Sequence, residues 1–111
     1  MVIFDNKITL ETAADRFAAL GSDSRLHVVL ALVRAGSKGL SVGDIQLRTN
    51  IAASTLAHHL RFLVTAGLVR QEKSGRSIIN YAEFSTLEAL AGYILKECCT
   101  DEMQNNGNSN E

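Results

Sequence analysis

The sequence predicts a mainly α-helical domain that carries a two-stranded β wing, and three observations lead to this fold class. Apolar residues recur at helical spacing in several segments, capping residues and glycines separate those segments, and two strand-like runs flank a Ser-Gly tip. At 111 residues the chain is long enough for one domain with a modest core. It contains no run of about eighteen apolar residues, so we expect no membrane span.

Capping residues define the first two helices. Thr9 can cap a helix over Leu10–Leu20, which Gly21 ends. Ser22-Asp23-Ser24 then offers caps for a second helix that runs through Ala35. This second helix is apolar around much of its circumference, so we expect it to be the buried centre of the domain.

A helix-turn-helix pattern occupies the middle of the chain. Ser41 caps a short helix over Val42–Arg48, and the link Thr49–Ala53 leads into a fourth helix that ends at Gly67. The apolar residues of this fourth helix share one face at the i, i+4, i+7, i+8 spacing: Leu56, Leu60, Leu63 and Val64. Hydrogen-bonding and cationic side chains cover much of the remaining surface, which suits the major groove of DNA.

The two strands of the wing are expected over Leu68–Glu72 and Ser77–Ala82, with Ser74-Gly75 at the tip. Lys73 and Arg76 flank that tip and can place positive charge beside phosphates. The complete pattern is that of a winged helix-turn-helix.

A capping box, Ser85-x-x-Glu88, is expected to open a last helix over Thr86–Cys99. The polar residues that follow form a segment poor in apolar side chains, which favours disorder. We therefore expect a domain over residues 1–100 and a disordered tail over residues 101–111.

Charge is distributed unevenly along the chain. Residues 46–81 carry five cations and one acid, whereas residues 86–111 carry one cation and five acids. Such asymmetry indicates a partner more directly than the net charge of −1 does. Five cations around a helix-turn-helix favour DNA over a merely solvated face. A winged helix that binds another protein is the alternative, and salt-dependent retention on heparin or DNA would distinguish the two.

Three segments of the chain resemble the ArsR/SmtB repressors. ALGSDSRLHVVLALVRAG resembles their second-helix region, STLAHHLRFLVTAGLVR their recognition helix, and SGRSIINYAEF their wing. The likeness covers roughly residues 10–97, and Ser24 replaces the usual proline. The resemblance implies a homodimer, packed through the first and last helices, that leaves its operator when an effector binds.

The resemblance also places five residues where these repressors face the major groove: Ser54, Thr55, Ala57, His58 and Arg61. Ser54 and Thr55 lie at the helix start, where short side chains and free N–H groups can hold a phosphate. His58 and Arg61 are long enough to reach base edges. Ala57 stands where the family often has serine, so it can offer only a methyl contact.

Other polar residues near this helix have less specific roles. His59 borders the apolar face, so we expect a packed, hydrogen-bonded histidine rather than a DNA contact or a metal ligand. Lys73 and Arg76 are expected to contact phosphates or the minor groove. Gln46 and Arg48 are equally compatible with backbone contacts and with solvation.

The metal sites of other ArsR/SmtB members are missing from this sequence. The segment Leu40–Asp44 lacks the Cys-Val-Cys of the arsenic site, and Thr86–Cys99 lacks the histidine needed for the zinc site. His27 is isolated in the second helix and is expected to be a core residue. No Gly-rich phosphate loop, nucleophile elbow or acid–base pair indicates an enzyme.

The adjacent thiols Cys98 and Cys99 remain as the candidate effector site. Vicinal thiols suit a thiophilic ion such as trivalent arsenic or antimony, and some arsenic-responsive members of the family carry cysteines at the end of the last helix. A partner thiol, a solvent oxygen or a methyl group on the arsenic would complete the coordination, and no permanent cofactor is expected. The alternatives are thiol-oxidation sensing, or a structural Cys98 that extends the apolar stripe of the last helix. Neighbouring cysteines rarely form a disulfide, so a reducing cytoplasm is the expected location.

Overall fold

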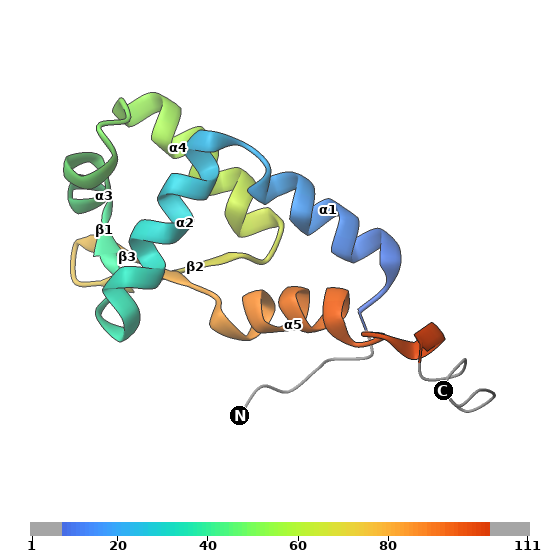
Figure 1. The fold of residues 1–111 in the computed structure, drawn as a ribbon. Helices are drawn as coiled ribbons and strands as arrows, with labels where there is room; N and C mark the ends of the chain where they lie inside the picture. Colours follow the sequence, from blue (N-terminus) through green and yellow to red (C-terminus); the bar gives the residue numbers. More distant parts are fainter. Residues whose placement is uncertain (1–7, 103–111) are drawn as a thin grey trace.

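A computed structural model of the chain describes residues 8–102. Within them the five expected helices are present, with three strands and one short 3₁₀ turn (Figure 1). The elements are, in order, α1 Leu10–Leu20, α2 Asp23–Ala35, η1 Gly36–Lys38, β1 Leu40–Ser41, α3 Val42–Thr49, α4 Ala53–Thr65, β2 Val69–Ser74, β3 Ser77–Ala82 and α5 Phe84–Leu95. Most of the expected tail, residues 103–111, lies outside the described part of the chain. No helix in residues 8–102 is long and apolar enough to cross a bilayer.

The first three helices begin where the capping residues predict. The side-chain oxygens of Thr9, Ser22 and Ser41 each accept a hydrogen bond from the backbone N–H three residues later, at 3.0, 3.2 and 3.1 Å. These bonds satisfy N–H groups that have no partner within the helix, and they stabilise each helix by roughly 1 kcal/mol. The local sequence therefore determines these starts.

The wing is part of a three-stranded antiparallel sheet with strand order β1-β3-β2. The hairpin pairs Val69 with Ala82 and Ser74 with Ser77, and β1 adds a pairing of Leu40 with the fully buried Asn80. The Asn80 amide donates to the Leu40 carbonyl at 3.1 Å and accepts from Gln71 at 2.8 Å. The third strand was not expected, because two residues carry no recognisable alternation.

Helix α2 lies in the middle of the molecule, as expected, but only one of its faces is buried (Figure 1). Val28, Val29 and Leu32 are at most 2 % exposed, whereas the opposite face leaves Leu26 and Leu30 more than 40 % exposed. The expectation that His27 is a core residue is wrong, because the side chain lies on the exposed face.

The boundaries of the last helix differ from the expectation. The helix begins at Phe84, and its N-cap residue Glu83 makes no side-chain capping bond, so the predicted capping box does not form. The Glu83 N–H, directly after β3, donates to the Leu68 carbonyl at 2.9 Å, which ties the helix start to the residue that precedes β2. The regular helix ends at Leu95 rather than at Cys99.

Candidate nucleic-acid interface

Helix α4 is attached to the core by the apolar face that its spacing predicts. Leu56, Leu60 and Leu63 are 0, 3 and 0 % exposed, whereas Val64 is half-exposed at the edge of that face. All five residues predicted to face the major groove are exposed: Ser54, Thr55, Ala57, His58 and Arg61. The helix therefore presents one continuous polar surface while its opposite side is buried.

The turn between α3 and α4 is closed by groups of α3 itself. Asn50 adopts a left-handed conformation with φ 60°, and its N–H donates to the Gln46 carbonyl at 2.7 Å. The Gln46 side-chain amide donates to the Ile51 carbonyl at 3.3 Å, so Gln46 stabilises the turn. Arg48 is exposed beside this turn.

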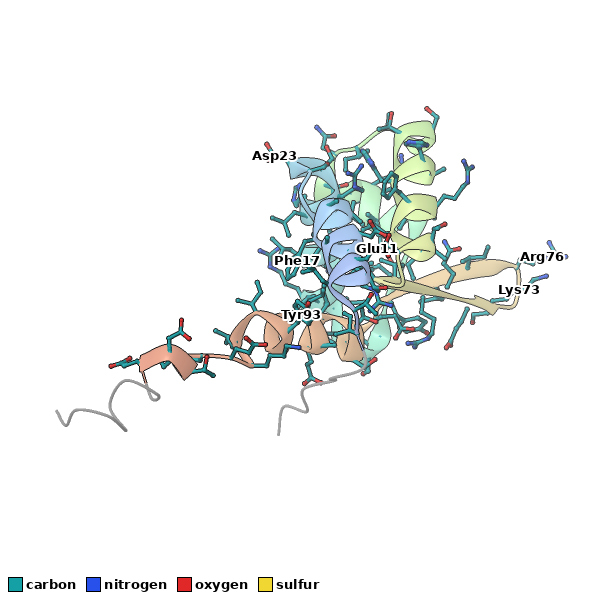
Figure 2. The ribbon with its side chains drawn as sticks, turned by 90° about the vertical axis from the view of Figure 1, so that its right-hand side faces the viewer. Glu11, Phe17, Asp23, Lys73, Arg76 and Tyr93 are labelled. Atoms are coloured by element: carbon teal, nitrogen blue, oxygen red, sulfur yellow. The ribbon has the colours of Figure 1, made fainter. Side chains whose placement is uncertain are left out.

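The wing tip carries the two predicted cations. Gly75 takes a φ of 63°, which the tight Ser74–Ser77 connection requires and which suits glycine. Lys73 and Arg76 are exposed at the end of a hairpin that projects well beyond the helices (Figure 2). Within residues 8–102 neither cation has an ion-pair partner.

Arg70, the fifth cation of the basic segment, is bound within the protein. It contacts the carboxylates of Glu72 and Glu83 at 2.8 and 3.3 Å and stacks over the Tyr81 ring at 4.6 Å. The hydrogen bond to Glu72 raises the pKa of Arg70 above its ordinary value. Of the five cations, four therefore have no ion-pair partner in the described part of the chain: Arg48, Arg61, Lys73 and Arg76.

His59 is half-buried, as expected, but the expected hydrogen bond is missing. Its Nδ1 is buried and has no partner among residues 8–102. Burial, with the nearby charges of Arg25 and His58, lowers the pKa of His59 below its ordinary value. A histidine that resists protonation suits the inner edge of α4 better than a phosphate contact.

Two arginines that tie α1 and α2 to α4 were not singled out from the sequence. Arg16 Nε donates to the Ala66 carbonyl at the end of α4, at 3.1 Å. The Arg25 guanidinium lies over the Phe62 ring at 4.4 Å and donates to the Ala19 carbonyl at 2.6 Å. In the sequence both look like ordinary solvated cations, because the residues that they contact at α4, Ala66 and Phe62, are distant along the chain.

The predicted thiol site lies in the turn after α5, at the end of the molecule opposite the wing (Figures 1 and 2). Both cysteines are exposed, and their Sγ atoms are 3.3 Å apart. Cys99 has a φ of 62°, which turns the chain and brings the thiols together. The contact with Cys98, together with Glu102, raises the pKa of Cys99. No third histidine, cysteine or carboxylate joins the two thiols to make a metal site in residues 8–102.

Comparison with known proteins places these features in a family. Residues 20–72 match a family model described as a helix-turn-helix domain. The chain is 36 % identical over 82 residues to YceK, an HTH-type transcriptional regulator of Bacillus subtilis (strain 168), covering 73 % of this chain and 81 % of that protein.

Solved structures share the fold. The ArsR-like transcriptional regulator from Rhodococcus sp. RHA1 superposes with a TM-score of 0.71 at 26 % identity, over 86 % of each chain. The homodimeric winged helix-turn-helix DNA-binding domain of Mb0332 from Mycobacterium bovis gives 0.63 at 23 % identity, over 79 % of this chain and 82 % of that one. With an exposed recognition helix and a cationic wing on this fold, the chain belongs to the ArsR family of winged helix-turn-helix transcriptional regulators and is a DNA-binding regulator, not an enzyme.

Proposed function

We propose that this regulator is a cytoplasmic homodimeric repressor that releases its operator when trivalent arsenic or antimony binds Cys98 and Cys99. The assignment of this effector rests on the pair of exposed thiols, whose sulfur atoms are 3.3 Å apart. Two soft donors at this separation can bind one thiophilic atom without a large rearrangement.

The ligand exchange balances without a redox step. Arsenous acid has three hydroxyl groups, and each As–S bond forms as a thiol proton leaves with one hydroxide as water. Two thiols therefore give a dithiolate that retains one hydroxyl and releases two waters. That hydroxyl, or a thiol of the partner subunit, fills the third position. A methylated arsenical already carries a carbon there.

Dimerisation is supported by an apolar groove between α1 and α5. The groove has a volume of about 600 Å³, and Phe17 and Tyr93 lie where the two helices approach each other (Figure 2). Leu10 and Ile94, at its edge, are 73 and 64 % exposed, which is costly for a protein that remains a monomer. A second copy would cover these side chains, and the Mb0332 domain, which shares this fold, is homodimeric.

The same groove connects the thiols to the dimer. Lys96 and Glu97 line it and immediately precede Cys98, and the Lys96 ammonium lies over the Tyr93 ring at 4.5 Å. A metalloid that changes the turn at the cysteines would therefore move residues at the dimer contact. The spacing of the two α4 helices depends on that contact, so operator affinity would change.

The test is release of the protein from its own upstream DNA, followed by fluorescence anisotropy. Arsenite is expected to release the DNA, and zinc at the same concentration is not. Persistent binding in saturating arsenite and antimonite would refute the effector assignment.

Thiol oxidation is the second candidate, favoured by the same 3.3 Å contact. Hydrogen peroxide would oxidise the two thiols to a disulfide and would itself be reduced to two waters. In that case peroxide, but not arsenite, would release the DNA, and a thiol reductant would restore binding.

A further inference from the structure

A second concave site lies between α1 and α4, separate from the thiols and from the α1–α5 groove. It has a volume of about 490 Å³, and its largely apolar wall includes Ala18, Phe62 and Ala66. Sites of a few hundred Å³ with apolar walls and a few polar groups are typical of small-molecule binding. Phe62 is 45 % exposed on a helix whose leucines are all buried, and contacts with DNA do not account for an exposed aromatic ring.

The walls of this α1–α4 groove are held in place by the two arginines. Arg16 fixes α1 to the end of α4 through the Ala66 carbonyl, at 3.1 Å. Arg25 lies over the Phe62 ring at 4.4 Å and restrains it. A ligand would therefore enter a site whose aromatic surface is already oriented, which reduces the entropy lost on binding.

Opposite charges face the groove from its two helices. Asp15 contributes a carboxylate from α1, and Arg61 contributes a guanidinium from α4. Within residues 8–102 neither makes an ion pair, so both charged groups are available to a ligand. An occupant that complements this arrangement has an apolar ring, an anionic group for Arg61 and a hydrogen-bond donor for Asp15.

We propose that the α1–α4 groove binds a small aromatic acid that carries an amino or hydroxyl donor. The ring packs against Phe62, the carboxylate pairs with Arg61, and the donor hydrogen-bonds to Asp15. His58 also lines the groove. An occupant therefore engages two residues assigned to DNA reading and weakens operator binding. This last consequence rests on the proposed function, whereas binding itself does not.

Isothermal titration calorimetry of the full chain with 4-aminobenzoate tests the site without DNA. Phe62→Ala is expected to weaken binding about tenfold, because the stacking surface is lost. Asp15→Ala, which removes the acceptor, should bind benzoate, which lacks the donor, as the wild type does, but should lose the preference for 4-aminobenzoate. Phe84→Ala is the matched control, because Phe84 has a similar exposure of 43 % but lies at the start of α5.

The proposal is overturned if the wild type gives no binding heat at millimolar 4-aminobenzoate. It is equally overturned if Phe62→Ala and Asp15→Ala both bind like the wild type, or if Phe84→Ala loses as much affinity as Phe62→Ala. Circular dichroism establishes that each variant is folded, and Asp15→Ala, at an exposed position, keeps the test decisive if Phe62→Ala does not fold. Adding 4-aminobenzoate to the operator complex then measures the coupling separately.

Discussion

Cys98 and Cys99 are the only thiols in the chain, and each supplies one of two soft donors. Cys98→Ser and Cys99→Ser should each retain folding and operator affinity, because serine is close in size and both positions are exposed. Each should lose release by trivalent arsenicals, since a single thiolate remains. Anisotropy titrations with arsenite and a methylated arsenical measure this. If both variants still release DNA, the cysteines are not the sensor.

The pH dependence of the thiols is a second consequence at the residue scale. Contact with Cys98 raises the pKa of Cys99, so less reactive thiolate is present at neutral pH and more appears as pH rises through the raised pKa. Cys98→Ala removes that contact and should return the pKa of Cys99 toward its ordinary value. The rate of alkylation at neutral pH should then increase. An unchanged pH–rate profile for Cys99 would show that the contact is not maintained in solution.

At the scale of elements, the wing and the recognition helix should contribute differently to DNA binding. Lys73→Ala and Arg76→Ala should weaken binding to all sequences, and each should reduce the slope of log K against log salt by about 0.9 per lost phosphate contact, or about 1.8 for the two copies in a homodimer. His58→Ala or Arg61→Ala should instead reduce discrimination between operator and random DNA by about 1–3 kcal/mol per base contact. Binding assays at several salt concentrations separate the two effects.

Arg70 provides a matched control on the same hairpin. Because it is paired with Glu72 and Glu83, Arg70→Ala should leave the salt slope nearly unchanged. A slope that falls as much as in Lys73→Ala would mean that Arg70 leaves its partners to meet phosphates. Binding that is flat with salt for the wild type would instead contradict phosphate contacts altogether.

The junction before β1 depends on one glycine. Gly39 has a φ of 65°, and an added Cβ would lie 2.7 Å from the Asn80 carbonyl oxygen. Gly39→Ala should therefore reduce the free energy of unfolding by at least about 2 kcal/mol. Gly36 has the same φ but open space around it, so Gly36→Ala should cost only about 1 kcal/mol. Thermal unfolding compares the two, and equal losses would mean that the clash is relieved by movement of the sheet.

Elements whose signals are local were predictable from the sequence. Thr9, Ser22 and Ser41 cap their helices through bonds that span three residues, so short-range patterns were sufficient. Leu40–Ser41 was missed as a strand because its partner, Asn80, lies forty positions away. The start of α5 was misplaced because the tether from Glu83 to Leu68 prevails over a local capping box.

In the candidate site too, the features with local signals were predictable from the sequence, and those that depend on distant contacts were not. Exposure of His58 and Arg61 followed from the apolar spacing of α4, which is a local signal. The ion pair between Arg70 and Glu83 depends on a contact between distant segments. The same is true of the α1–α4 groove, which Asp15 lines. No periodicity in the chain encodes those contacts.

For the whole molecule, the surface to test is the α1–α5 groove. Ile94 is 64 % exposed in the single chain, so Ile94→Asp should leave the fold intact and yield monomers. Leu90 is 2 % exposed, so Leu90→Glu should unfold the chain instead of separating a dimer. Leu47 on α3 is 86 % exposed and away from the groove, which makes Leu47→Asp the control. Sedimentation equilibrium distinguishes these states, and a dimeric Ile94→Asp would place the interface elsewhere.

The pairing of β1 with β3 has a mechanical consequence for recognition. Ser41 ends β1 and caps α3, so the helix-turn-helix begins at a strand that is hydrogen-bonded to the wing. The pairing therefore fixes the distance between the wing hairpin and the helix-turn-helix. This distance cannot adjust to an irregular DNA duplex. The DNA must therefore deform to fit the protein. Operators with easily deformed pyrimidine–purine steps between the contacted grooves should be bound in preference to stiff A-tracts.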